Sequence, residues 1–465
     1  MLLLSVRDRF WPEHAEIAPM TGDVNVAVAE FGSLGSDGRV TVTDESSALA
    51  SSVFEVLDRE LLTLEAAPAD GDPFDFEVRP PEDTGAVDGD TNDERAAQAA
   101  RIADEIDADV IVYAVLDESD GTTSTTPEFF LTDRNLVADA QEMVGQYQLG
   151  KAVQQQALIA SDINARRAIR AVLLERANGL VQLIVGLSHY GARDYGTAIT
   201  IFDEIDRLQL MGIDGGAEIL YLFLGNAAGR VADLDRAESA YRQALEIDPS
   251  YARAQVGVAE TTFQRSHNDC APGTIDADGV RRSIDLYLDA LEAEHQPARS
   301  NIPAKVALGA GRGYLCLSVA RVEDAWAPAR EHLSQVVDAH EAGTDDIGEL
   351  AAEAWSSLGL LEIQTSEGDP EGLDRAAQAL LTAIELGSQP GSDSSGLPGW
   401  YGMLGYAYCR LDREEDALSA YDQALGAYDS ADTSARGSVG TPVRGDRQSY
   451  DDARALVTDG DPGSC

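Results

Sequence analysis

Few residues in this chain have the types and spacing that catalysis or cofactor binding requires. Gly309, Gly311 and Gly313 form a glycine-rich run. A dinucleotide-binding loop lies between a strand and a helix, whereas this run lies inside a helical pattern, so we interpret it as packing. Neither a GxxxxGK[ST] phosphate loop nor a GxSxG nucleophile motif occurs. The sequence therefore predicts no recognisable catalytic machinery and no cofactor.

Side chains that could bind a metal are equally sparse. His267 and Cys270 are separated by two residues and could form half of a metal site, but no second pair has ligand spacing, so an ordinary loop is the simpler interpretation. His332 and His340 lie eight residues apart on a predicted helix, where exposed or capping roles are commoner. The four cysteines are Cys270, Cys316, Cys409 and Cys465. Their wide separation predicts neither a disulfide framework nor a CxxC metal site.

The charge of the chain excludes one class of partner. Among 465 residues, 82 are acidic and 34 basic, so the net charge is −48. Such a chain repels phosphate backbones, and we expect no nucleic-acid binding. Only Lys151 and Lys305 are lysines, which favours adaptation to high salt over an acidic surface made for a basic partner. An arginine bias also follows from GC-rich coding, so both interpretations stay open.

The ends of the chain differ from its middle. Leu2, Leu3 and Leu4 precede charged residues, and this run is shorter than the apolar region of a signal peptide. Residues 1–21 are either a frayed terminus or the remainder of a membrane anchor or signal that begins upstream, and we expect upstream apolar residues that tether the protein to a membrane. Within the chain, no apolar run approaches the ~20 residues of a membrane-spanning helix.

Residues 22–135 alternate between strand and helix patterns. Predicted strands occupy 24–31, 74–78 and 109–116, and predicted helices occupy 46–64 and 94–106. We expect an unstructured acidic loop at 82–93, a polar turn at 120–126 and an edge strand at 128–131. The order of elements, with Val26 to Phe31 and Ala108 to Tyr113, resembles the amino-terminal TolB-like domain that precedes repeats in many bacterial proteins. The resemblance implies a small α/β domain.

Two later segments share one spacing: a glycine, an alanine twelve residues on, a tyrosine four further and an alanine three beyond that. The residues are Gly225, Ala237, Tyr241 and Ala244 in one segment, and Gly405, Ala417, Tyr421 and Ala424 in the other. The pattern closely resembles the tetratricopeptide repeat (TPR), a helix–turn–helix of about 34 residues. Small residues let the two helices approach, and the aromatic ring fills the gap against the next repeat.

Weaker copies of this spacing bring the count to about six repeats between 179 and 430. The sequence thus predicts a mostly α protein, a right-handed TPR α-solenoid preceded by the small α/β domain. Connecting helices are expected at 136–178, including one long helix from 162 to 183. A polar tail follows at 431–465, with a capping helix at 448–457.

Two functions fit this organisation. The first is a non-catalytic scaffold that binds a protein or peptide of unknown identity in the solenoid groove. The second is an enzyme or small-molecule sensor whose α/β domain binds the ligand while the repeats regulate it. The absence of a catalytic motif favours the scaffold.

The TPR resemblance also implies which residues line the groove, because helix-A positions outside the packing signature face it. Carried over to this sequence, they are Asn226, Arg230, Arg253, Glu260, Tyr406 and Arg410. Leu180, Leu183 and Leu187 of the first repeat imply that this end is covered. Arg230 and Arg410 could clamp a carboxylate or phosphate of the partner. Alternatively, each pairs with a local aspartate such as Asp233 or Asp412.

The charge generates a prediction about salt. If the net charge of −48 is an adaptation to salt, self-repulsion destabilises the fold at low ionic strength, and screening restores it. Thermal melts between about 0.05 M and about 2 M salt take the Debye length from over ~10 Å to under ~3 Å. We expect the melting temperature to rise across this range; a flat profile would rule the adaptation out.

Overall fold

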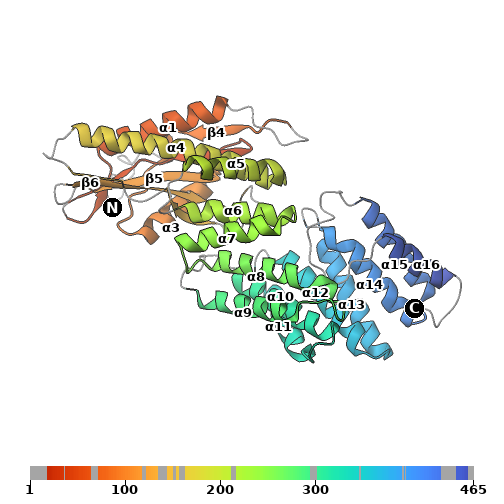
Figure 1. The fold of residues 1–465 in the computed structure, drawn as a ribbon. Helices are drawn as coiled ribbons and strands as arrows, with labels where there is room; N and C mark the ends of the chain where they lie inside the picture. The colour runs from red at the N-terminus through yellow and green to blue at the C-terminus, as the bar shows by residue number, and fades with distance from the viewer. Residues whose placement is uncertain are drawn as a thin grey trace, which may run out of the picture. The chain divides into compact units, whose positions relative to one another are not determined.

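The computed structural model describes residues 18–35, 37–63, 72–117, 122–132, 134, 144–149, 153–156, 163–210, 216–293, 301–344, 347–389, 392, 394–430 and 447–458. The chain divides into two compact units, with the boundary between Leu224 and Gly225 (Figure 1). The first unit is the small α/β domain with the helices that follow it. The second unit is entirely helical in its described residues. A helical solenoid preceded by a small α/β domain is therefore confirmed.

The first unit is built on a mixed sheet centred on β5. Its strands are β1 (Val24–Val28), β2 (Gly32–Leu34), β3 (Val40–Thr41), β4 (Phe76–Arg79), β5 (Val110–Asp117), β6 (Thr122–Leu131), β7 (Gly145–Gln148) and β8 (Val153–Gln156). Strand β5 is parallel to β1 and β2 on one side and antiparallel to β6 on the other. Its nearly continuous apolar run fits a strand covered on both faces.

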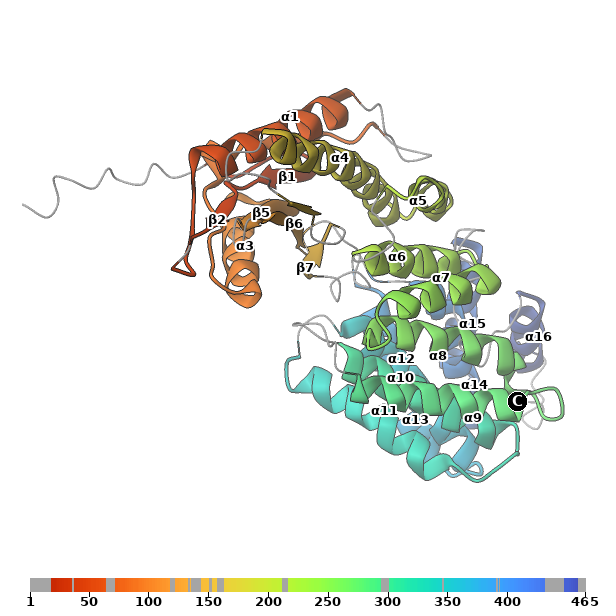
Figure 2. The ribbon, with the colours of Figure 1, turned by 60° about the vertical axis from the view of Figure 1, so that its left-hand side comes forward.

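Helices cover both faces of this sheet. Helix α1 (Asp44–Thr63) and α4 (Ile163–Gly191) lie on one side, and α3 (Asn92–Ile106) lies on the other (Figures 1 and 2). Helix α3 begins with a capping box between Thr91 and Glu94. Its apolar stripe packs on Tyr113 and Phe130 of the sheet, so α3 is held by its start signal and by its buried face.

The sheet extends further along the chain than the sequence pattern indicates. Residues 122–126, predicted as a turn, begin β6, which pairs with three strands instead of forming an edge. The helical connection predicted at 136–178 is wrong at β7 and β8, and the loop predicted at 82–93 contains the short helix α2 (Pro81–Thr84). Threonines at 122, 123, 125 and 126 explain β6, because β-branched side chains favour strands.

Helix α4 is apolar because of its neighbours. Residues 167–191 are long and apolar enough to cross a membrane by composition alone, but more than half of the most apolar window is buried in the unit. Helix α4 packs against α1 and against α5 (Tyr195–Leu208). The contacts with α1 and α5 account for its hydropathy as that of a core helix.

From α4 onward, the α-helices follow one another in pairs. They are α4 with α5, α6 (Ala217–Arg230) with α7 (Leu234–Ile247), α8 (Ala252–Ser266) with α9 (Ala277–Asp289), α10 (Ile302–Val319) with α11 (Trp326–Glu341), α12 (Gly348–Thr365) with α13 (Pro370–Gly387), and α14 (Leu397–Arg410) with α15 (Glu414–Ser430). Helix α16 (Arg447–Thr458) packs on α14 and α15, at the place of the predicted capping helix. These six pairs match the six predicted repeats.

The signature glycines lie where two helices of a pair cross. A Cβ atom on Gly225 would lie 2.5 Å from Cε1 of Tyr241, and one on Gly405 would lie 2.8 Å from Cε1 of Tyr421. The weaker repeats show the same contact between Gly186 and Phe202, Gly311 and Leu333, and Gly359 and Leu380. The spacing of the repeats therefore reflects a steric requirement at each crossing.

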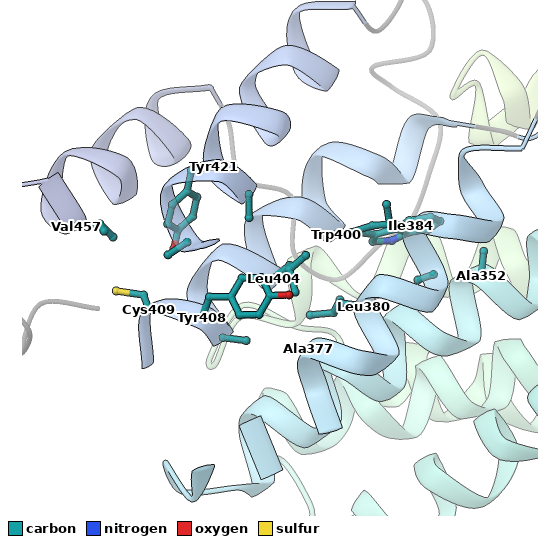
Figure 3. Close-up of a cluster of buried hydrophobic side chains, with 14 residues drawn as sticks. Ala352, Ala377, Leu380, Ile384, Trp400, Leu404, Tyr408, Cys409, Tyr421 and Val457 are labelled. Carbon is teal, nitrogen blue, oxygen red and sulfur yellow. The ribbon is translucent and has the colours of Figure 1, made fainter. Parts of the chain in front are cut away.

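The last pairs enclose a continuous apolar core. Leu380 and Ile384 of α13 meet Trp400, Leu404 and Tyr408 of α14 (Figure 3). Val457 of α16 belongs to the same cluster. Because α16 covers apolar side chains of the last pair, it shields them from water, as a terminal repeat must.

Disulfide bonding of the described cysteines was not expected. Cys270 and Cys316 form a disulfide across 46 residues, and both side chains are fully buried. Cys409 is also disulfide-bonded. The prediction of no disulfide pairing is wrong because the insertion after α8, with η4 (Asn268–Cys270), folds back against α10. Buried disulfides are typical of proteins that fold in an oxidising compartment.

The helix crossings generate a matched pair of substitutions. Gly225→Ala places a methyl group against Tyr241 and should lower the free energy of unfolding by about 1–3 kcal/mol. Gly229→Ala, one helical turn later with nothing within 4 Å, should raise it by up to ~1 kcal/mol through helix propensity. Urea denaturation measures both. Equal effects of the two substitutions would contradict the role of Gly225.

Candidate functional site

The first helices of successive pairs in the second unit are joined by an ion network, which marks the face they share. Arg312 of α10 lies between Glu260 of α8 and Glu353 of α12: its Nη2 is 3.7 Å from Oε1 of Glu260 and its Nη1 is 3.5 Å from Oε2 of Glu353. Its guanidinium lies 5.0 Å from the ring centroid of Phe263. We call the surface presented by α6, α8, α10, α12 and α14 the first-helix face.

Glu260 is held in its ionised form. Tyr287 donates a hydrogen bond to its Oε2, and Gln264 Nε2 donates to its Oε1 at 2.9 Å. Burial alone would raise the pKa of Glu260, but Arg312 and these donors outweigh burial and lower it. Burial and the negative charge of Glu260 raise the pKa of Tyr287. A carboxylate with a lowered pKa is suited to electrostatic positioning and not to donating a proton.

Asn226 and Arg230 of α6 gather around the signature tyrosine of their own pair. The Tyr241 hydroxyl donates to Oδ1 of Asn226 at 2.7 Å. Burial and the charge of Glu260 raise the pKa of Tyr241, and the charge of Arg230 opposes that rise. The predicted residues Asn226, Arg230 and Glu260 therefore share one electrostatic environment.

Arg253 is placed differently from the sequence-based expectation of an open groove residue. Only 6% of its surface is exposed. Its Nη1 lies 3.4 Å from the hydroxyl of Tyr251, and its guanidinium lies 6.0 Å from the Tyr251 ring centroid. Arg253 is thus a buried cation beside Tyr251 and not an open groove residue.

Arg410 is an exposed cation at the end of α14. Its Nη1 donates to the hydroxyl of Tyr406 at 3.0 Å, and its guanidinium lies 5.9 Å from the Tyr406 ring centroid. Within the described part of the chain, no carboxylate forms an ion pair with Arg410, and Asp412 is not its partner. The charge of Arg410 is therefore available to a ligand.

The groove residues predicted from the sequence did not include Arg312 and Glu353 of this face, nor Tyr287 of α9, which donates a hydrogen bond to Glu260. A signal existed for Arg312, since it follows Gly311 directly, as Asn226 follows Gly225 and Tyr406 follows Gly405. The glycine-rich run was interpreted only as packing. The packing interpretation is confirmed, because Gly309 lies against Tyr287 and Gly311 against Leu333.

Other candidate groups have structural roles. Cys270 is in a disulfide, and Nδ1 of His267 accepts from the amide of Asp269 at 3.0 Å, so this pair is not half of a metal site. Across the ranges described above, no group of three His, Cys, Asp or Glu side chains could hold a metal ion. His332 stacks on Tyr314 with ring centroids 5.7 Å apart.

Among the described residues of the α/β unit, Arg95 and Glu128 form a buried ion pair. Arg95 Nε lies 3.2 Å from Oε2 of Glu128, and the two side chains are 10% and 2% exposed. Arg95 also donates to the carbonyl of Gly89 and to the side chain of Asn92. Burial raises the pKa of Glu128, although Arg95 opposes the rise. Because acceptors of the unit itself occupy the guanidinium, this pair fixes α3 on the sheet.

Comparisons with known proteins give helical-repeat structures. No protein-family model and no curated sequence matches the chain. A type IV pilus biogenesis factor, PilW, is 13% identical over 55% of this chain and 96% of its own, with a TM-score of 0.39. A chain of the APC/C hetero-tetramer Cut9–Hcn1 is 15% identical over 62% of this chain and 46% of its own, with a TM-score of 0.42. A TPR protein of Thermus thermophilus, TTC0263, is 18% identical over 52% of this chain and 100% of its own, with a TM-score of 0.34.

The repeat architecture of this chain rests on the helix crossings described above. The resemblance of residues 22–135 to a TolB-like domain stays a prediction.

The ion network predicts a pH-dependent loss of stability. Arg312→Met removes the cation between two carboxylates and should cost about 2–4 kcal/mol of unfolding free energy at pH 7, less than a fully buried pair because both glutamates are part-exposed. The lowered pKa of Glu260 stabilises the fold above the unfolded value of about 4.3. This stabilisation is lost as pH falls through the folded pKa.

The difference between wild type and Arg312→Met should therefore shrink between pH 7 and about pH 3. Urea denaturation at several pH values measures it. Arg454→Met, whose ion pair with Asp422 is exposed, is the control and should change stability by less than ~1 kcal/mol. A difference for Arg312→Met that is constant with pH would contradict the assigned role.

Proposed function

We propose that this chain is a non-catalytic protein-interaction scaffold whose first-helix face binds an acidic segment of a partner protein. The observation that carries the proposal is a reversal of charge. The chain as a whole has a net charge of −48. When the first helices α6, α8, α10, α12 and α14 are aligned on their small residues, the positions of the six predicted groove residues hold five cations and two carboxylates in all, a net charge of +3. These residues are Arg230, Arg253, Lys305, Arg312, Arg410, Glu260 and Glu353.

The reversal matters because the surrounding surface is acidic. A local positive region on an acidic protein attracts anionic groups only where they reach it, which favours specificity. Arginine suits this purpose because its planar guanidinium binds a carboxylate through two parallel hydrogen bonds. Arg410, exposed and without a carboxylate partner in the described residues, is the best placed to do so.

The alternative of an enzyme or small-molecule sensor depends on the α/β unit. Its buried Arg95–Glu128 pair is satisfied within the unit, which supports a structural role. We therefore propose that the α/β unit is an accessory domain and that the helical repeats bind the partner. Buried disulfides are compatible with an exported protein.

The experiment uses labelled eight-residue peptides of alternating Glu and Ala, with Gln-for-Glu peptides as the uncharged comparison. We expect the Glu peptides to bind more tightly. The double variant Arg230→Ala with Arg410→Ala should weaken binding by ~1.5–3 kcal/mol for each charged hydrogen bond lost, with an almost unchanged melting curve.

The matched control removes two cations from elsewhere. Arg447→Ala with Arg454→Ala changes the net charge equally, and both side chains form exposed ion pairs on α16. This control should retain the affinity of the wild type. If both double variants lose affinity equally, long-range charge explains binding and the proposed site is wrong. Equal binding of Glu and Gln peptides would also contradict it.

A further inference from the structure

A cavity lies beside the first helix α8 and the second helices α7 and α9. It has a volume of about 770 Å³ and is lined by α7, α8 and α9 with the residues that follow them. Three arginines, Arg242, Arg265 and Arg282, come to it from three different helices. Cations are scarce in this chain, so their convergence requires an explanation.

Two of these arginines already have carboxylate partners. Arg242 Nη2 lies 2.7 Å from Oε1 of Glu238. Arg265 Nη2 lies 2.6 Å from Asp235 and 3.4 Å from Glu238. Arg282 differs: it is exposed, and no described residue forms an ion pair or hydrogen bond with it. Among the arginines of this cavity, Arg282 is therefore the one with no acceptor in the described part of the chain.

The repeats themselves show what occupies this place elsewhere. Between α12 and α13, Glu362 is 8% exposed and pairs with Arg375, whose Nη2 lies 3.1 Å from Oε2. Arg330 of α11 pairs with the other oxygen of the same carboxylate. In that repeat, a glutamate of the first helix α12 therefore pairs with arginines of the second helices α11 and α13.

The two repeats can be aligned residue by residue. Arg375 precedes Leu380 by five residues, and Arg282 precedes Tyr287, the equivalent packing residue, by five. Glu362 follows the small residue Gly359 by three, and Thr262 follows the equivalent Ala259 by three. Arg282 thus corresponds to Arg375, and Thr262 stands where the carboxylate would be.

Thr262 cannot replace that carboxylate. Its side chain is short, and its hydroxyl donates to the carbonyl of Val258 at 2.7 Å. Both Thr262 and Arg282 line the cavity. The repeat therefore retains the arginine, has a threonine at the position of the carboxylate, and contains a cavity lined by both side chains. The volume of this cavity is one that small ligands occupy.

We propose that this cavity binds the carboxylate of a short peptide, which takes the place of the Glu362 side chain. The carboxylate accepts two hydrogen bonds from the guanidinium of Arg282. Asp289 and Glu292 line the same cavity and face the amine of the peptide. Asp289 lies seven residues, or two turns, beyond Arg282, a rise of about 10 Å along α9. An extended peptide of about three residues spans that distance.

Calorimetry with trialanine as the probe tests the proposal. Trialanine should bind the full chain. Trialanine amide, which lacks the carboxylate, should bind at least about tenfold more weakly. Arg282→Ala should produce the same loss with free trialanine. Arg281→Ala is the matched control, because this neighbour pairs with Asp278 and Glu323; it should bind as the wild type does. Acetyl-trialanine should bind several-fold more weakly, since Asp289 and Glu292 lose the ammonium group.

A substitution that fills the site gives an independent readout. Thr262→Glu restores the carboxylate of the other repeat, so it should abolish trialanine binding and change the melting temperature little. No binding to the wild type at millimolar trialanine, equal binding of the amide, or unchanged binding in Arg282→Ala would overturn the proposal. Arg282→Ala should leave binding of the acidic eight-residue peptides unchanged, so this site and the first-helix face succeed or fail separately.

Discussion

The close crossing of two helices at a small residue is the constraint on which the repeat architecture depends. At Gly225 and Gly405 there is no room for a Cβ atom against the ring of the paired helix. Because the backbones approach this closely, the ring of Tyr241 also reaches Gly257 on the next first helix. One aromatic side chain thus fixes the spacing within a pair and between pairs, and the helices are positioned before any surface residue contributes.

The crossing also determines which polar groups lie inside. The hydroxyls of Tyr241 and Tyr287 extend past the crossing to the first-helix face, where they meet Asn226 and Glu260. A buried hydroxyl needs an acceptor, so the residue after the small one on the first helix becomes polar. Arg312 then balances Glu260 and Glu353. The polar network is in this sense a consequence of using tyrosine as the packing residue.

The sequence predicted those parts of the fold that have a local period. The helix pairs, the strand β5 and the long helix α4 follow from apolar spacing within one element. Pairings between distant segments were missed: the Cys270–Cys316 disulfide joins residues 46 apart, and β7 and β8 are recognisable only by their pairing with β6. Short polar strands carry too little apolar periodicity to be identified alone. The network around Arg312 was missed for the same reason, because Glu260, Tyr287 and Glu353 come from three different helices.

The repeats differ most at positions whose side chains do not pack in a helix crossing. Gly359 and Ala259 are both small because a helix crosses there, whereas three residues later one repeat has Glu362 and the other Thr262. In the first case the carboxylate is buried between two arginines; in the second the equivalent arginine lines a cavity. An internal ion pair of this kind adds little net stability, because desolvation offsets much of the attraction. Replacing its carboxylate by threonine therefore costs the fold little and leaves a cation that an external carboxylate can reach. Degenerate repeats offer this route to binding sites in general: the steric positions maintain the solenoid, and the loss of one internal partner exposes the other.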